Sequence, residues 1–207
     1  MAVFCAKVFA FRLYGAFLVL GEILMRTGLL LKFESSRCQR LHDYWWELKR
    51  ACEQAVPKKS DFNPAAVKNI LPHILMHDLG IPGRSILRLV GTGIVDRMGF
   101  DPTGKDYVEF VSEDRKESAY QELFKTASFP CGMKVIIEGR YESGQIHVSE
   151  SLGYPLIADN DDRPLMVFVD DVIEKIEWHQ KADKQVEYYK VRQRDYIDIG
   201  FGIPLPS

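Results

Sequence analysis

The sequence predicts an α+β fold in which a pair of strands and a group of three strands flank a set of helices. Two apolar stretches, residues 73–79 and 85–91, surround Pro82-Gly83 and are typical of a β-hairpin. Three more, roughly residues 133–141, 145–157 and 164–173, are separated by turn-forming residues and indicate a β-meander. Between the two groups, residues 113–127 have the apolar spacing of a helix.

Composition limits the class of protein. The 207 residues are 46% hydrophobic and 27% charged, which is enough apolar material for one domain with extensions or for two small domains. The net charge of −2 gives no basic field, so we expect no nucleic-acid partner. Four scattered cysteines without a C-x-x-C motif fit a reducing compartment, and we expect a cytoplasmic protein.

Residues 1–35 are expected to form an apolar leader of uncertain structure. The uninterrupted apolar run, residues 13–21, is shorter than the ~20 residues that a membrane-spanning helix needs. No A-x-A-like cleavage site follows it. We expect an amphipathic or poorly ordered leader. A membrane anchor, a signal sequence and a mis-called start codon remain alternatives, and contact with a membrane is expected only if residues 1–31 act as an anchor.

Two helices are expected before the first strand. Residues 41–55 present one apolar face that includes Trp45, and Pro57 ends this helix. Asn63-Pro64 is a good helix start, and the second, short helix runs to about Leu71. Because one layer of helices covers only one side of a sheet, we expect residues 41–55 to cover the other side, alone or across a dimer.

The stretch that follows the second strand folds tightly back on itself. Gly91 and Gly93 break the strand, residues 94–98 form one helical turn that closes at Gly99, and residues 101–104 form another turn. A chain that returns over a sheet in this way tends to enclose a small cavity. At the other end of the sequence, residues 174–194 are charged and expected to be helical, and a tail follows.

Several motifs then resemble those of a bacterial group of compact, stand-alone PAS proteins. The motifs are Tyr44-Trp45 with Leu48 and Arg50, Asp61 with Pro64, Ile70-Leu71-Pro72, Arg-Leu-Val-Gly-Thr at 88–92 and Gly-Phe-Asp-Pro-Thr-Gly at 99–104. The resemblance covers about residues 41–173. We therefore divide the chain into the leader (1–35), a PAS-like domain with N-terminal helices (36–175), and a charged helical segment with its tail (176–207).

This resemblance implies a five-stranded antiparallel sheet with short helices over one face. It also implies a sensory or protein-interaction role, frequent dimerisation and no catalysis. PAS domains that hold haem usually offer a histidine from the long helix, and residues 113–127 contain none. Covalent flavin chemistry needs a cysteine among the short helices, and residues 92–112 contain none. We expect a non-covalently held organic ligand or no ligand.

Other chemistry finds little support in the sequence. Gly91-Thr92-Gly93 follows a strand like a dinucleotide fingerprint, but Asp96 stands where the third glycine belongs. His73 and His77 would lie roughly 13 Å apart on a strand, too far to share a metal. The acidic loop 159–162 lacks the glycine and distal glutamate of a calcium site. No G-x-S-x-G motif is present, so we predict no catalytic and no metal-binding residue.

The predicted ligand-binding residues are Arg88, Thr92 and His147. In this hypothesis, Arg88 reaches beneath the short helices and binds an anionic ligand. The alternatives are that Arg88 pairs with an acid such as Asp96, or lies on the outer face of the sheet. The predicted function is a PAS-type sensory and interaction module that forms a homodimer or binds a signalling partner. A nucleotide-binding enzyme, and an adaptor whose interior is filled by its own side chains, are the alternatives.

Overall fold

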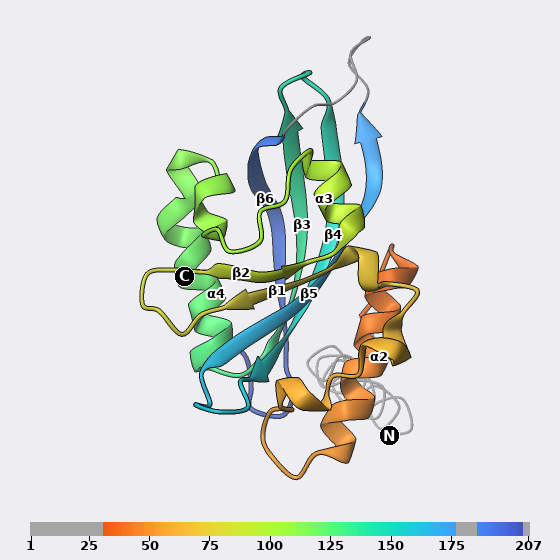
Figure 1. Ribbon diagram of the computed structural model, residues 1–207, viewed down its shortest axis with the longest axis vertical. Helices are drawn as coiled ribbons and strands as arrows, with labels where there is room; N and C mark the ends of the chain where they lie inside the picture. Colours follow the sequence, from red (N-terminus) through yellow and green to blue (C-terminus); the bar gives the residue numbers. More distant parts are fainter. Residues whose placement is uncertain (1–30, 177–185, 205–207) are drawn as a thin grey trace, which may run out of the picture.

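The computed structural model describes residues 31–176 and 186–204, which form one six-stranded antiparallel sheet with helices on both faces (Figure 1). The strands are β1 (Ile74–Asp78), β2 (Ile86–Val90), β3 (Gly132–Tyr141), β4 (Ile146–Ile157), β5 (Pro164–Ile176) and β6 (Val186–Ile197). The α-helices are α2 (Ser36–Ala51), α3 (Thr92–Met98) and α4 (Lys116–Ser128). Short 3₁₀ helices are η1 (Lys59–Asp61), η2 (Pro64–Val67), η3 (Leu71–His73), η4 (Tyr107–Phe110) and η5 (Glu113–Arg115).

The α+β fold with its hairpin and meander is confirmed. β1 and β2 pair antiparallel, and β3, β4 and β5 follow one another in the sheet, whose order is β2-β1-β5-β4-β3-β6. β1 joins the last strand of the meander, with Ile74 opposite Val169 and Asp78 opposite Leu165. This pairing makes β5 a central strand, with a neighbouring strand along each of its edges.

The sheet has a sixth strand where the sequence predicted a helix. The prediction of a helix is wrong for residues 174–176, which continue β5, and for residues 186–194, which belong to β6. Residues 177–185 of that prediction lie outside the described residues. β6 pairs with β3 from Gly132–Ile197 to Tyr141–Val186, which covers the edge of the expected five-stranded sheet. Its valines and tyrosines favour a strand despite the intervening charges.

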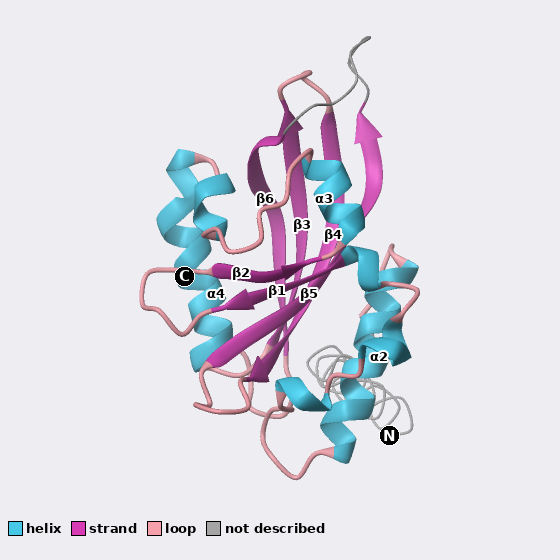
Figure 2. Cartoon of the chain, in the orientation of Figure 1, coloured by secondary structure: helices cyan, strands magenta, loops and turns pink. Residues whose placement is uncertain are grey.

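Helix α2 covers one face of the sheet, as predicted (Figure 2). Its buried residues Leu41 and Trp45 pack in one core with Leu152, Val167 and Val169 of β4 and β5. The helix starts earlier than the predicted Leu41, since the Ser35 hydroxyl caps it by accepting hydrogen bonds from the backbone N–H groups of residues 37 and 38. It also ends earlier, at residue 51 instead of 55.

The opposite face of the sheet carries α3, η4 and α4. The predicted second helix is divided into η2 and η3, with Asn63 as the expected N-cap of η2. The single helical turn after β2 is confirmed as α3, which ends at Gly99 with φ 78°. Met133, Val135 and Phe168 of the sheet pack with Leu123 of α4 on this side.

The predicted leader lies almost wholly outside the described residues. Leu31 and Phe33 are described, and both pack against the core beneath α2. Within residues 31–176 and 186–204 no helix is both long enough and apolar enough to cross a membrane.

A buried carboxylate joins the segment before α2 to the sheet. Glu150 of β4 is fully buried, and its Oε2 accepts hydrogen bonds from the backbone N–H groups of Glu34 (3.0 Å) and Ser35 (2.7 Å). These N–H groups precede the helix, and the positive end of the helix dipole adds to the attraction. The Lys134 ammonium lies 3.9 Å from the other carboxylate oxygen.

We predict that Glu150→Ala lowers the free energy of unfolding by about 2 kcal/mol or more, because a buried and a partly buried backbone donor lose their acceptor. Urea denaturation measures the effect. Glu174→Ala, on an exposed glutamate of β5, is the matched control and should change stability by less than about 0.5 kcal/mol. Equal effects of the two variants would show that Glu150 does not hold this segment.

Gly91 is required for a reason that differs from the predicted one. Its φ of −66° is available to any residue, so the turn itself does not need glycine. However, a Cβ atom at Gly91 would lie 2.4 Å from the Pro72 carbonyl oxygen of η3. At Gly93 the nearest atom is the same oxygen at 3.1 Å. The close approach of η3 to α3 therefore depends on the first glycine more than on the second.

Gly91→Ala should destabilise the protein by about 1–3 kcal/mol, since backbone atoms must move apart. Gly93→Ala should cost less, because its contact is milder and alanine favours a helix by up to about 1 kcal/mol. Thermal and urea unfolding of the two variants provide the comparison. A larger loss for Gly93→Ala would contradict the proposed packing of η3 on α3.

Candidate ligand cavity

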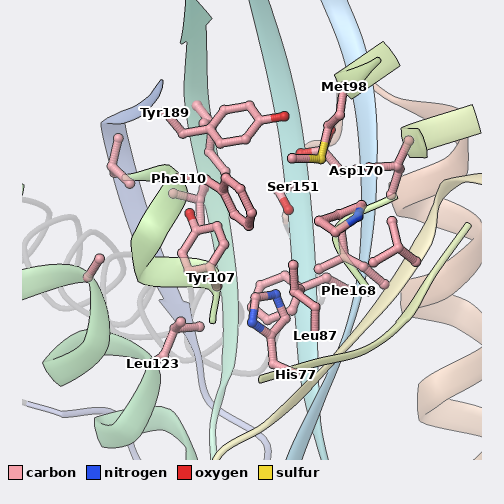
Figure 3. A pocket seen from close by; sticks show the side chains of 18 of the residues that line it. His77, Leu87, Met98, Tyr107, Phe110, Leu123, Ser151, Phe168, Asp170 and Tyr189 are labelled. Atoms are coloured by element: carbon pink, nitrogen blue, oxygen red, sulfur yellow. The ribbon is translucent and has the colours of Figure 1, made fainter. Parts of the chain in front are cut away.

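A cavity of about 80 Å³ lies between the sheet and the helices α3, η4 and α4 (Figure 3). Every strand of the sheet contributes to its wall. Most of the lining is apolar or aromatic, and the lining side chains include Leu75, Leu87, Ile94, Met98, Phe110, Leu123, Met133, Val135, Phe168 and Val191. The volume exceeds the ~30 Å³ that one water occupies in the liquid. It is well below the ~300–1,000 Å³ of pockets for drug-sized ligands.

His77 is a polar residue in this mostly apolar wall. It is buried in β1, and its Nδ1 lies 2.8 Å from the hydroxyl of Ser85. The ring packs edge-on against Tyr107 and Phe168, with centroid distances of 5.1 and 5.2 Å. Burial lowers the pKa of His77 to about 3, so the imidazole is neutral at physiological pH. Its Nε2 forms no hydrogen bond with the described residues.

Three hydroxyl groups also line the cavity. Tyr107 of η4, Tyr189 of β6 and Ser151 of β4 come from separate elements and surround the same space (Figure 3). None of the three side chains forms a hydrogen bond within the described part of the chain. Burial raises the pKa of Tyr107 to about 12 and raises that of Tyr189 further, so both phenols are neutral. The cavity thus contains unused hydrogen-bonding capacity.

An ion pair lies at the α3 end of the cavity. The Arg97 guanidinium of α3 donates to the Asp170 carboxylate of β5, and both side chains are nearly buried. Burial lowers the pKa of Arg97, but the Asp170 carboxylate together with the nearby Tyr189 and Tyr141 hydroxyls raises it by more in total, so the guanidinium is charged. The opposite charges leave this end of the cavity neutral.

A second arginine, Arg194 of β6, lies in the wall near α4. Its Nη1 is 3.7 Å from Oε2 of Glu122, and its Nε is buried without a hydrogen-bond partner among the described residues. Burial raises the pKa of Glu122, but hydrogen bonds from Lys125 and Tyr196 lower it by more. Glu122 is therefore an ionised partner for the arginine.

The structure brings none of the three predicted ligand residues to this cavity. Arg88 is half exposed and pairs through Nε with Asp78 at 2.8 Å, which matches the predicted alternative of a salt bridge, although with a different acid from Asp96. Thr92 is exposed at the start of α3. His147 is buried, and its Nδ1 lies 3.1 Å from the Tyr141 hydroxyl.

Sequence reasoning missed the residues that do line the cavity, although two signals were present. His77 was considered only as a metal ligand together with His73 and not as a lone polar group in an apolar strand. Asp170 directly follows the apolar run of residues 165–169 and is buried, and a buried acid needs a cation. No local sequence pattern identifies Arg97 as the partner of Asp170, because Arg97 and Asp170 are far apart in the chain.

The surroundings of Gly91 and the composition of the cavity wall also bear on dinucleotide, metal and covalent flavin binding. The Leu71 and Pro72 carbonyl oxygens would lie about 2.5 Å from a Cβ at Gly91, so no space remains there for a pyrophosphate. The described residues contain no cluster of three or more His, Cys, Asp or Glu side chains that could hold a metal. No cysteine is among the residues that line the cavity.

The neutral state of His77 predicts a pH dependence of stability. Its folded-state pKa of about 3 lies below the ordinary 6.5. Between these values the unfolded chain binds a proton that the folded chain does not, so stability is lost as pH falls below 6.5. From pH 7.5 to 5.5, the wild type should lose about 1.4 kcal/mol more than His77→Phe. Urea denaturation at both pH values measures this. Equal losses would mean that His77 is not kept neutral by the fold.

Comparisons with known proteins are consistent with the described architecture. A family model described as PAS domain matches residues 33–168, about two thirds of the chain. A search of curated proteins finds no match. β6 and the end of β5 lie beyond the range that the family model matches.

The solved structures with similarity to this chain include three at low sequence identity. A light-oxygen-voltage domain studied with a flavin analogue is 12% identical, with 53% of this chain and 83% of that chain covered and a TM-score of 0.42. The PAS-B domain of Drosophila melanogaster Cycle with bound glycerol is 14% identical (48% and 97% covered, TM-score 0.37). The Rhodobacter sphaeroides LOV protein is 10% identical (63% and 67% covered, TM-score 0.39). By the family model, this chain belongs to the PAS domain family, whose members are sensory signalling modules.

Proposed function

We propose that this chain is a sensor that binds a small organic molecule in the cavity beneath α3, η4 and α4. The ligand is held without metal or covalent bonds, and the module acts by rearrangement and not by catalysis. The output is a contact with a second copy of the chain or with a signalling protein. The observation that carries the proposal is the largely apolar cavity with unpartnered polar groups in its wall.

The cavity favours a ligand over an adaptor with a filled interior. Protein cores are packed closely, and few voids exceed the size of a water molecule. Leaving about 80 Å³ empty costs about 2 kcal/mol at the usual cost per unit of cavity volume. A ligand that fills the space removes this cost and also satisfies the polar groups. Both effects lower the free energy of the ligand-bound state.

A short path connects the cavity to the far face of the sheet. Asp170 and Asp171 are neighbours on β5, so their side chains point to opposite faces. Asp170 binds Arg97 at the cavity, whereas Asp171 accepts from the Ser35 hydroxyl (2.7 Å) and from Arg37 (2.5 Å) at the start of α2. A ligand that shifts the Arg97–Asp170 pair moves the same piece of backbone that holds α2. We propose that α2 conveys the signal to the partner.

Native mass spectrometry tests ligand binding and assembly together. The purified chain should carry a small mass increment, which we expect to be absent in Ala119→Leu, because this α4 alanine lines the cavity and leucine fills it. Ala51→Leu, on the exposed last residue of α2, is the matched control and should retain the increment. The same spectra report whether the chain is a dimer.

Two results would count against the proposal. An increment retained by a folded Ala119→Leu protein would place the ligand elsewhere. A complete absence of any increment, together with a higher melting temperature for Ala119→Leu than for the wild type, would favour an adaptor whose cavity has no natural ligand. In the second case the leucine simply repairs a packing defect.

A further inference from the structure

Each charged side chain in the cavity wall lies beside a group of opposite charge. Arg97 is paired with Asp170, Arg194 lies beside Glu122, and His77 is neutral. A charged ligand would give up its hydration and find no free opposite charge in this wall. Burying an unpaired charge costs far more than an ordinary contact returns. A neutral ligand avoids this penalty.

The polar groups in the cavity wall favour a ligand that can form hydrogen bonds. The hydroxyls of Tyr107, Ser151 and Tyr189 and the Nε2 of His77 face the same space and have no partner among the described residues. A hydroxyl both donates and accepts, and a neutral imidazole nitrogen does one or the other. A purely apolar molecule would leave these groups unpaired, which costs free energy in a site shielded from water.

The remaining wall selects the size and shape of the ligand. The cavity of about 80 Å³ admits a handful of non-hydrogen atoms. His77, Tyr107, Phe110, Phe168 and Tyr189 offer ring surfaces for stacked or edge-on contacts (Figure 3). Met98 and Met133 are flexible side chains that adapt to an inserted ring. These features favour one small ring over a long chain or a fused-ring cofactor.

Resting on the proposed sensor function, we infer that the cavity takes a neutral single-ring molecule that carries one hydrogen-bonding group, of the chemical class that phenol represents. The ring lies among the aromatic side chains. Its polar group pairs with the hydroxyls and the imidazole of the wall. The Arg97–Asp170 pair remains intact beside the ligand.

Titration calorimetry with three matched pairs of probes tests this class. Toluene has the size of phenol without its hydroxyl, so phenol should bind about fivefold more tightly, as expected for one net hydrogen bond. Benzyl alcohol should bind at least tenfold more tightly than benzylammonium, and benzamide at least tenfold more tightly than benzoate. Each pair differs mainly in its polar or charged group.

Four single variants locate the hydrogen-bonding group: His77→Phe, Tyr107→Phe, Ser151→Ala and Tyr189→Phe. At least one should lower the ratio of phenol to toluene affinity twofold or more. Tyr188→Phe is the control, because Tyr188 is not among the residues that line the cavity, and it should leave the ratio unchanged. A purely structural role would weaken both probes equally and leave the ratio unaltered.

The outcomes separate this inference from the proposed function. Binding of benzoate as tight as that of benzamide would overturn the neutral class and identify Arg194 as a free cation. Toluene binding as tightly as phenol, or a ratio unchanged in all four variants, would overturn the hydrogen-bonding part. Binding by none of the six probes would overturn the whole inference. The mass increment and its loss in Ala119→Leu would still decide independently whether the cavity holds a ligand.

Discussion

The arrangement of both helical layers depends on two neighbouring aspartates in the central strand β5. Asp170 and Asp171 lie in a sheet that is covered on both sides, and an acid there is stable only with a partner. Each partner comes from a different layer, Arg97 from α3 and Arg37 from α2. Arg97–Asp170 is nearly buried, and removal of one member of such a pair typically costs about 3–5 kcal/mol, because the other is left uncompensated. The partly exposed Arg37–Asp171 pair contributes less. The pairs therefore fix where both helices sit.

This constraint also explains why a cavity persists in an otherwise close-packed molecule. Where apolar groups meet, the sheet packs tightly. For example, a Cβ atom added at Gly153 would lie 2.2 Å from the Phe168 ring. On the same face, the Arg97–Asp170 pair and the hydrogen-bonded residues His77 and Ser85 hold their side chains in place. The apolar residues between them cannot close inward without breaking these contacts. The empty volume is the space left between fixed polar groups.

β6 has a larger role than a covering for an exposed edge. It supplies Tyr189, Val191 and Arg194 to the cavity wall, although it lies beyond the matched range of the family model. It is also joined to α4, since Arg194 and Tyr196 both contact Glu122. Part of the candidate site is thus contributed by a segment outside the range that the family model matches.

The elements that the sequence predicted are those with strong local signals. The hairpin, the meander, α3 with its terminal Gly99 and the face covered by α2 all follow from apolar spacing and turn residues. β6 was missed because its charges suggested an exposed helix, whereas the strand is defined by pairing with β3, about 60 residues away. The start of α2 was placed too late because the capping role of Ser35 depends on the contacts that position α2.

The candidate site was the least predictable part, and the reason lies in the two faces of a strand. Arg88 was placed in the cavity from its position in an apolar strand, but in the structure it turns outward to Asp78. Its neighbour Leu87 takes the cavity side. A strand alone cannot tell which set of alternate residues faces inward when both contain apolar side chains. The positions of two buried acids decide which set of residues faces inward. Asp78 pairs with Arg88 and Arg163 at the outer edge, and Asp170 pairs with Arg97 at the cavity. The location of the site therefore follows from long-range charge pairing, which local sequence patterns do not encode.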